Sequence, residues 1–403
     1  MTTTLVHSVL LVSHGTETPD AWVLLDGPQV AAVGQGTTWR ARVDVDGSAD
    51  GPTPAPPGTT VVDGTGKVLV PGFVDVHGHG ALGVGYEQPA GPTEVLRAVE
   101  HHRSHGSTHQ VLSLATAPLD ALADRLALVA ELTRTPGSGV LGSHLEGPWL
   151  ALSHCGAHDT RLLRTPSAAD VARLLAVADG TLVQVTLAPE LPGATEAIRA
   201  LVDARVVPAV GHTGADLETT QRAFDAGARV LTHALNGMPG LHHRAPGPVA
   251  AALADDRVTL EVVNDGVHVH PAMVALLAAQ APGRVALVTD AGAATGQGDG
   301  TYRLGSMDVR VAGGVARLVE GGSLAGSTLT LDAALRRAVQ DVGLPLGQAV
   351  GAVTDVPARA VGRPDLGVLR VGSRSDAVLL DARLRVDTVW FNGRSLPGAP
   401  NEE

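Results

Sequence analysis

The chain of 403 residues is poor in aromatic side chains, in cysteine and in lysine. Aromatic residues make up 2% of it while 44% is apolar, so Ala, Val and Leu must fill the large core that this length can bury. Cys155 is the only cysteine, which excludes an intrachain disulfide and favours a cytoplasmic location. Lys67 is the only lysine, so arginine supplies the other fixed positive charges.

The sequence also lacks a long apolar run and an excess of positive charge. No stretch reaches the roughly 18 uninterrupted apolar residues that a membrane span needs, so we expect no membrane partner. The N-terminal segment has no basic n-region and no small-residue cleavage site, which predicts a strand rather than a signal peptide. A net charge of −12 argues against nucleic acid as a partner, so a phosphorylated ligand would need a local cluster of Arg or His.

Both ends of the chain carry short apolar segments separated by turns. The N-terminal region contains LVHSVLLV, AWVLLDG and QVAAVG, and residues 365–396 alternate with no helical period. The Pro/Gly-rich stretch 46–59 predicts an exposed loop. We therefore predict a small β-sandwich domain formed by both termini, residues 1–67 and 361–403, with one large catalytic domain, residues 68–360, inserted between its halves.

The interior alternates between apolar runs and Ala/Leu/Arg-rich segments with helical spacing. Continuous apolar strands separated by helices indicate a parallel sheet buried on both faces, and eight of them predict an α/β fold, a (β/α)8 TIM barrel. An open doubly wound sheet is the alternative, but no glycine-rich phosphate motif follows the first run. The runs cover residues 72–80, 107–116, 139–148, 181–190, 204–213, 228–237, 257–268 and 283–292.

Polar residues gather where these predicted strands end. The active site of a TIM barrel lies at the C-terminal ends of its strands, and a buried strand has little physical reason to end in histidine or carboxylate. His77 and His79 are two residues apart, so their side chains share one face of a strand and can bind one cation. A lone histidine after a strand is more often structural, so the prediction rests on the whole set. Imidazole and carboxylate ligands suit Zn²⁺ or Fe²⁺, and the other members of the set are Glu146, His212, His233 and Asp290.

Motifs spread over essentially the whole chain resemble those of one enzyme family. They are PGFVDVHGHG (71–80), HLEGPW (144–149), GHT (211–213), HALNGM (233–238), NDGVHVHP (264–271), TDA (289–291) and AGSTLTLD (325–332). Each motif alone is unspecific, but together they resemble the amidohydrolase superfamily and, within it, the N-acetylglucosamine-6-phosphate deacetylases. The resemblance implies a metal-bearing barrel joined to a β-sandwich that both termini build.

The resemblance also implies a set of metal ligands. Glu146, His212 and His233 would be the core ligands, and His77 and His79, the HxH pair, could hold a second ion. The number of divalent ions, one or two, and their identity, Zn or Fe, stay open. Many superfamily relatives, such as hydantoinases and dihydroorotases, bridge two metals with a carboxylated lysine after the fourth strand. Lys67 precedes the first strand, so any bridging role falls to Glu146.

The implied reaction is hydrolysis of the N-acetyl group of N-acetylglucosamine 6-phosphate to glucosamine 6-phosphate and acetate. A bound divalent ion lowers the pKa of its water from about 16 towards about 7, and a carboxylate within hydrogen-bond reach can take the proton. Asp290 is the candidate general acid/base; its alternative role is to turn the chain after the last strand. His158 matches the family histidine that polarises the acetyl carbonyl, and its alternative is a surface-loop histidine.

A phosphate site that is completed across a dimer interface is implied as well. Arg244 and His268 match the family's phosphate-contacting positions, and arginine suits phosphate because its planar fork donates two hydrogen bonds. Asn236 and Gly237 would add an amide and a backbone N–H. Arg244 could instead be an exposed loop arginine. We therefore expect a phosphorylated amino sugar as substrate and a homodimer in which Arg244 serves its own or the neighbouring subunit.

Two other functions stay open at this point. The chain could be an amidohydrolase of another N-acyl amine, such as N-acetylgalactosamine 6-phosphate or an unphosphorylated amide, and phosphate dependence would distinguish them. It could also be a non-catalytic scaffold, although the complete set of candidate ligands argues against that. The role of His144 beside Glu146 stays open, and the remaining histidines near strands are expected to be structural: His101, His102, His105 and His109.

Overall fold

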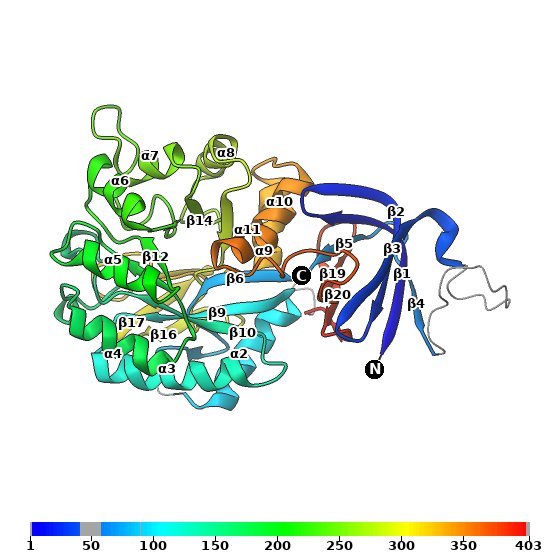
Figure 1. Cartoon of the computed structure of the whole chain (residues 1–403), viewed down its shortest axis with the longest axis horizontal. Coiled ribbons are helices and arrows are strands. Elements are labelled where there is room, and N and C mark those ends of the chain that lie inside the picture. Colours follow the sequence, from blue (N-terminus) through cyan, green and yellow to red (C-terminus); the bar gives the residue numbers. More distant parts are fainter. Residues whose placement is uncertain (1, 41–57, 89, 400–403) are drawn as a thin grey trace.

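The computed structural model describes residues 2–40, 58–88 and 90–399. The predicted exposed loop at 46–59 lies almost entirely outside these ranges. Within them, no helix is both long enough and apolar enough to cross a membrane. The chain forms a large barrel domain and a smaller β-domain at one end of the molecule (Figure 1).

The smaller domain is a β-sandwich built from both ends of the chain, as predicted. Its strands hydrogen-bond in the order β21-β20-β19-β5-β1-β2-β3, and β4 pairs with β1. Alternation along the strands places Val6, Leu25, Leu379 and Trp390 in one buried apolar cluster. The boundaries after residues 67 and 360 stay a prediction. The strands are β1 (Thr3–Ser13), β2 (Thr16–Asp26), β3 (Gln29–Gln35), β4 (Thr60–Asp63), β5 (Val68–Pro71), β19 (Ala377–Leu380), β20 (Val386–Phe391) and β21 (Arg394–Pro397).

The barrel contains eight parallel strands, one inside each predicted apolar run. They follow the order β15-β14-β13-β12-β11-β10-β9-β6, so sequence neighbours are spatial neighbours. The Asp290 N–H donates to the His77 carbonyl at 2.8 Å, which brings the last strand back to the first and rules out the open doubly wound sheet. The strands are β6 (Phe73–Gly78), β9 (Ser107–Ala115), β10 (Val140–Glu146), β11 (Leu182–Leu187), β12 (Val207–Val210), β13 (Val230–Leu231), β14 (Thr259–Val263) and β15 (Val285–Val288).

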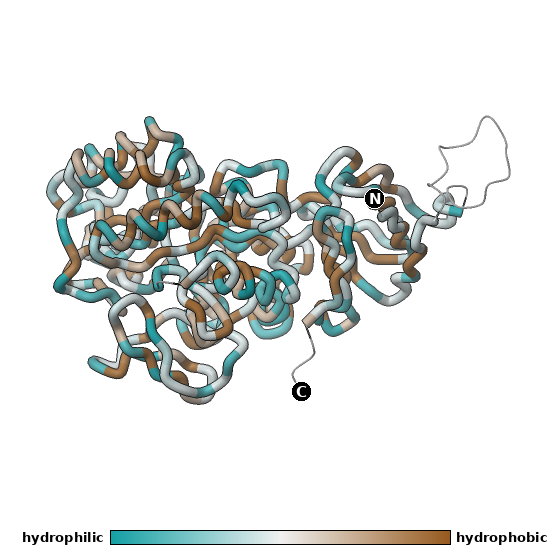
Figure 2. Tube along the Cα trace, turned by 90° about the horizontal axis from the view of Figure 1, so that it is seen from below, coloured by the Kyte–Doolittle hydropathy of each residue, from teal (hydrophilic) through white to brown (hydrophobic). Residues whose placement is uncertain are grey.

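Helices follow the barrel strands and cover the outside of the sheet (Figure 1). Apolar stretches recur through both domains, as the brown segments in Figure 2 show. Local sequence sets the helix ends: the Ser167 hydroxyl caps α4 by accepting from the Asp170 N–H at 3.1 Å. The helices are α2 (Pro92–Ser104), α3 (Leu119–Arg134), α4 (Ala168–Ala178), α5 (Ala194–Asp203), α6 (Leu217–Ala226), α7 (Gly247–Ala254), α8 (Pro271–Gln280), α9 (Leu331–Gln340), α10 (Leu346–Val353) and α11 (Asp355–Ala360), with short 3-10 helices η1 (Gly36–Trp39), η2 (Leu152–His154) and η3 (Thr160–Leu162).

Between β15 and α9 along the chain there is a three-stranded antiparallel sheet, which the sequence analysis did not predict. It consists of β16 (Gly300–Leu304), β17 (Met307–Ala312) and β18 (Val315–Leu318). Its apolar face packs on Ala115 and Ala157, next to the barrel mouth. At its first turn the Ser306 hydroxyl donates to Asp159 at 2.8 Å, so the sheet fastens the loop that carries His158. A two-stranded ribbon, β7 (Gly80–Ala81) and β8 (Val84–Gly85), follows β6.

Candidate metal centre

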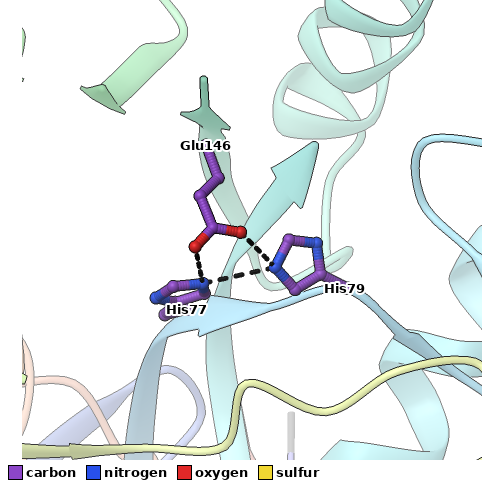
Figure 3. Close-up of side chains that lie close together, drawn as sticks. All are labelled: His77, His79 and Glu146. Carbon is purple, nitrogen blue, oxygen red and sulfur yellow. Dashed lines mark hydrogen bonds and ion pairs between the residues drawn. The ribbon is translucent and has the colours of Figure 1, made fainter. Parts of the chain in front are cut away.

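The HxH pair and Glu146 meet at the C-terminal mouth of the barrel. Figure 3 shows both imidazoles turned towards the Glu146 carboxylate at the end of β10. The Nε2 atom of His79 lies 3.1 Å from Glu146 Oε2, and that of His77 lies 3.7 Å from Oε1. The two Nε2 atoms are 3.2 Å apart, and both histidines are buried. These three residues offer ligand atoms that could hold one metal ion.

A second group of ligand atoms shares the same glutamate. His212 follows β12 and His233 follows β13, and each places Nε2 3.0 Å from Glu146 Oε1. Their two Nε2 atoms are also 3.0 Å apart. Glu146, His212 and His233 therefore form a second candidate metal group. The structure brings together all five residues that the sequence analysis predicted as metal ligands.

The chain reaches this arrangement through an uncommon backbone conformation at three of the predicted residues. His212, His233 and Asp290 have φ angles of 46°, 28° and 49°. Residues other than glycine rarely adopt positive φ, and such strain tends to cluster at functional sites. Each of the three stands two residues after a barrel strand, where the turn directs the side chain into the mouth.

Asp290 lies at the edge of the first group of ligand atoms. Its Oδ1 is 3.4 Å from the Nε2 of His79 and 3.5 Å from that of His77, and the residue is 8% exposed. Backbone hydrogen bonds to His77 and Ser327 fix its position between β6 and the segment before α9. The carboxylate is thus close to the ligand atoms and largely buried.

The donor set fits a divalent metal ion. His212 Nδ1 donates to the His154 carbonyl at 2.9 Å, so a neutral His212 has no proton on Nε2. That bare nitrogen lies 3.0 Å from an oxygen of the Glu146 carboxylate, and the lone pairs of these two atoms repel one another unless positive charge lies between them. Tightly grouped imidazole nitrogens and a carboxylate are the ligand types that zinc-like ions prefer.

The electrostatics of the cluster favour positive charge. Burial opposes protonation of His77, but the nearby Glu146 and Asp290 carboxylates outweigh it and raise its pKa well above the usual value. Burial by itself would raise the pKa of Glu146, yet the neighbouring histidines, His77 first, lower it well below the usual value. A buried anion that resists protonation and attracts cations is what a metal centre requires.

His158 is buried beside the cluster, so it is not a surface-loop histidine. The Thr116 N–H donates to its Nδ1 at 3.3 Å, and the Thr116 hydroxyl lies 2.9 Å from the same atom. Since Nδ1 accepts, the proton of the neutral ring sits on Nε2, which lies 3.5 Å from Glu146 Oε2. Burial lowers the pKa of His158 to about 4, despite the opposing effect of Glu146, so the ring is a neutral N–H donor.

His144 is a structural histidine beneath the cluster. Its Nδ1 lies 2.9 Å from the Ser113 hydroxyl and its Nε2 lies 2.8 Å from the Thr186 hydroxyl, so both ring nitrogens are engaged. Its ring packs edge-on against His77, with centroids 4.6 Å apart. Lys67 pairs with Asp387 of β20 at 3.0 Å, within the terminal sheet, and takes no part in the cluster.

The predicted substrate-binding residues lie in different surroundings. Asn236 and Gly237 follow His233, and a Cβ added at Gly237 would come within 2.9 Å of His212 Nδ1, so this turn borders the cluster. His268 is a buried side chain whose Nδ1 pairs with Asp265 Oδ2 at 2.7 Å. Arg244 is exposed, and within the described residues its guanidinium has no hydrogen-bond or ion-pair partner.

Sequence analysis missed several residues that support the cluster. Glu261 of β14 lies 3.0 Å from His77 Nδ1, and Asp75 of β6 accepts from the Thr289 hydroxyl at 2.6 Å. Each interrupts an apolar strand, and that interruption could have identified them. Thr116 gave no such indication, because its contact with His158 depends on how a distant loop folds back.

Comparisons with known proteins agree with this geometry. A sequence model of the amidohydrolase family matches residues 68–396. The chain is 40% identical over 338 residues to an N-acetylgalactosamine-6-phosphate deacetylase of Escherichia coli O157:H7, covering 83% of this chain and 89% of that protein. It is 35% identical over 329 residues to an N-acetylglucosamine-6-phosphate deacetylase of Vibrio furnissii, covering 81% and 82%.

A solved structure shows the same likeness along nearly the whole chain. It is a variant of the N-acetylglucosamine-6-phosphate deacetylase of Mycobacterium smegmatis in complex with N-acetylglucosamine 6-phosphate. The TM-score is 0.89 at 39% identity, over 98% of this chain and 99% of that one. With a family match over most of its length and relatives of this identity, the chain belongs to the amidohydrolase family.

Proposed function

We propose that this chain is a metal-dependent deacetylase that hydrolyses N-acetylglucosamine 6-phosphate to glucosamine 6-phosphate and acetate. The observation that carries the proposal is the pair of ligand groups that share Glu146 beside Asp290 at the barrel mouth. The names of the similar proteins supply the substrate class. A non-catalytic scaffold would have no need to keep this complete buried set.

The two groups of ligand atoms would hold two divalent ions, Zn²⁺ or Fe²⁺. His77, His79 and Glu146 would hold one ion, and Glu146, His212 and His233 would hold the other. When bound, such an ion activates a water molecule by lowering its pKa towards about 7 and polarises the substrate carbonyl. Metal analysis of the purified protein measures both the identity and the number of the bound ions.

Asp290 would act as the general acid/base. It accepts a proton from the attacking water through its carboxylate while the water oxygen bonds to the acetyl carbon. It then donates that proton to the sugar nitrogen as the C–N bond breaks, and the remaining acidic proton of the new carboxyl group passes to the amine, which leaves acetate and the protonated amine. Its position 3.4 Å from His79 Nε2 keeps it next to the ligand atoms that surround the reacting group.

His158 would stabilise the negative charge that develops on the carbonyl oxygen. The Thr116 N–H donates to Nδ1, so the ring proton is on Nε2, 3.5 Å from Glu146 Oε2, and it would donate to that carbonyl oxygen when substrate is bound. The low pKa of His158, about 4, means that it does so as a neutral imidazole near neutral pH. A fixed donor of this kind needs no rearrangement when the charge appears.

The 6-phosphate would be bound by Arg244 and His268, with Asn236 and Gly237 completing the sugar site. Burial disfavours the charged form of His268, but the hydrogen bond to Asp265 and its charge raise the pKa of His268 overall. The exposed, unpaired guanidinium of Arg244 supports the proposal that it reaches the phosphate of a neighbouring subunit in a homodimer. We further propose a cytoplasmic location, which the single cysteine favours.

The test is steady-state release of acetate from three sugars by the metal-loaded protein. These are N-acetylglucosamine 6-phosphate, N-acetylgalactosamine 6-phosphate and unphosphorylated N-acetylglucosamine. The galactosamine epimer is included because a relative at 40% identity is named for it. We expect the glucosamine phosphate to have the highest kcat/KM and the unphosphorylated sugar the lowest.

A higher kcat/KM for the galactosamine phosphate would move the assignment to the other epimer while leaving the site intact. Equal turnover with and without phosphate would contradict the phosphate site. No acetate from any of the three sugars, with metal bound, would remove the deacetylase assignment.

A further inference from the structure

Glu261 is a buried carboxylate in the middle of an apolar barrel strand. It occupies the centre of β14 (Thr259–Val263), and its side chain is 1% exposed. Its oxygens meet three donors: His77 Nδ1 at 3.0 Å, the Gln184 amide at 2.8 Å and the His233 backbone N–H at 3.4 Å. Burying a carboxylate is costly unless it is hydrogen-bonded, and here both oxygens are engaged.

The contact with His77 determines which face of that imidazole is free. A carboxylate accepts, so Nδ1 carries the ring proton and the Nε2 lone pair points to the opposite side. On that side lie His79 Nε2 at 3.2 Å and the oxygens of Glu146 and Asp290. Glu261 therefore presents His77 to the cluster as a ligand with a bare Nε2.

The same carboxylate contacts one residue from each of the two ligand groups. Through one oxygen it holds the side chain of His77, from the first group, and the backbone of His233, from the second. The Gln184 amide of β11 fixes the other oxygen, which keeps the carboxylate from rotating. Glu146 also contacts both histidines, but it does so at their Nε2 atoms, whereas Glu261 binds Nδ1 of His77 and the backbone N–H of His233.

We infer that Glu261 is a positioning residue of the metal centre, which orients His77 and strengthens its binding of the metal ion. Partners of this kind commonly change metal affinity by about 10–100-fold, because they fix the ring and raise the basicity of the ligand nitrogen. The inference deepens the proposed function, since it concerns the same site, but it depends only on metal binding and not on the substrate.

Glu87 provides a matched control for the role of Glu261. Its side chain is also 1% exposed, and it lies behind the other histidine of the HxH pair. Its Oε2 is 4.0 Å from His79 Nδ1, beyond hydrogen-bond distance, and neither atom has a hydrogen-bond partner. Glu87→Gln therefore changes a buried carboxyl group beside the HxH pair without breaking a hydrogen bond to an imidazole.

The experiment measures metal binding directly. Metal-free wild type, Glu261→Gln and Glu87→Gln are titrated with Zn²⁺ by calorimetry, and with Co²⁺ while the visible ligand-field bands are recorded. We expect Glu261→Gln to weaken one of the two bound ions by about 10–100-fold and to change the cobalt spectrum. Glu87→Gln should bind both ions with near wild-type affinity.

A second variant helps to distinguish a loss of metal affinity from a folding defect. Gln184→Met removes the amide that fixes Glu261 without touching any imidazole, and it should weaken the same ion to a lesser degree. Thermal unfolding of each metal-free variant shows whether the fold is retained.

Wild-type affinity for both ions in a folded Glu261→Gln would overturn the inference, as would an equal loss in Glu87→Gln. A wild type that binds no divalent ion would overturn it as well. Failure of the proposed function would give a different result: the metal would bind as expected, but no acetate would be released from the phosphorylated sugar.

Discussion

At the scale of single residues, His158 shows how a neighbouring residue determines which ring nitrogen of a histidine carries the proton. Thr116 occupies Nδ1, which leaves the Nε2–H for the substrate. We predict that His158→Ala lowers kcat by about 10²–10³-fold, the effect of removing one donor to a developing oxyanion. Metal content should not change, because His158 belongs to neither group of ligand atoms. Rapid-quench or steady-state kinetics with metal analysis measure both, and a changed KM at constant kcat would contradict the assignment.

The pair of His268 and Asp265 leads to a pH prediction. Asp265 raises the pKa of His268 against the effect of burial, so the imidazolium is present below that raised value and is lost as pH increases through it. If His268 binds phosphate, KM for the phosphorylated sugar should rise over that same interval. Asp265→Asn should move the rise to lower pH, which profiles of KM between about pH 5 and 9 would show. An unchanged KM profile in the variant would remove His268 from the phosphate site.

The metal ligands could be predicted from sequence because they are polar residues at the ends of buried, mainly apolar strands. Histidine and carboxylate at the ends of buried strands need a chemical reason, and His77 and His79 have the spacing of one strand face. Glu261 carries the same contradiction but stands inside its strand, where a single polar residue is easily overlooked. The resemblance alone assigned His158 to the acetyl carbonyl and left the role of His144 open. Only the fold shows that both ring nitrogens of His144 contact hydroxyl groups, whereas Nε2 of His158 faces Glu146.

At the scale of elements, a buried ion cluster joins two helices outside the active site. Asp332 of α9 pairs with Arg336 at 2.6 Å and with His105, just after α2, at 3.2 Å. Burial would raise the pKa of Asp332, but the hydrogen bond and charge of His105, followed by Arg336, lower it below 3.8. The carboxylate therefore stabilises the fold above pH 3.8, and that contribution is lost as pH falls through the lowered pKa.

We predict that Asp332→Asn lowers the free energy of unfolding by about 1.5–3 kcal/mol at pH 7. The difference from wild type should shrink as pH falls below 3.8, where the unfolded carboxyl becomes protonated. Urea unfolding followed by circular dichroism at several pH values provides the measurement. A difference that stays constant down to low pH would mean that Asp332 acts through packing rather than charge.

The eight barrel strands were predictable because each lies in a mainly apolar run between segments with helical spacing. The sheet of β16–β18 was not, since its strands are half exposed and form one small unit after the eighth run had completed the barrel. Its alternation, together with glycine at the β17–β18 turn, was the available indication. β13 has only two residues although its run spans 228–237, because the positive φ at His233 ends the strand early.

At the scale of the whole molecule, joining both termini into one domain was predictable from matching alternation at the two ends. The homodimer was expected only through the family resemblance, because a surface that meets another copy leaves no periodic pattern in one chain, and it stays a prediction. The expected dimer bears on the role of Arg244. Within the described residues its side chain is exposed and has no partner, whereas the resemblance implies that it binds the substrate phosphate.

Subunit complementation tests whether Arg244 acts across an interface. A subunit with Arg244→Ala keeps Asp290, and a subunit with Asp290→Asn keeps Arg244. If Arg244 serves its neighbour, dimers mixed from these two inactive variants contain one complete site, and random mixing restores about a quarter of wild-type activity. Mixtures with no more activity than their separate components would place Arg244 in its own subunit or outside the site.

The central claim is that Asp290 moves the proton in a metal-dependent deacetylation. The most direct measurement is acetate release from N-acetylglucosamine 6-phosphate by wild type and Asp290→Asn, with bound metal counted in both. We predict turnover by wild type and a loss of at least about 10²–10⁴-fold in the variant, with the metal retained. Undiminished turnover by the variant, or no acetate from a metal-loaded wild type, would contradict the account.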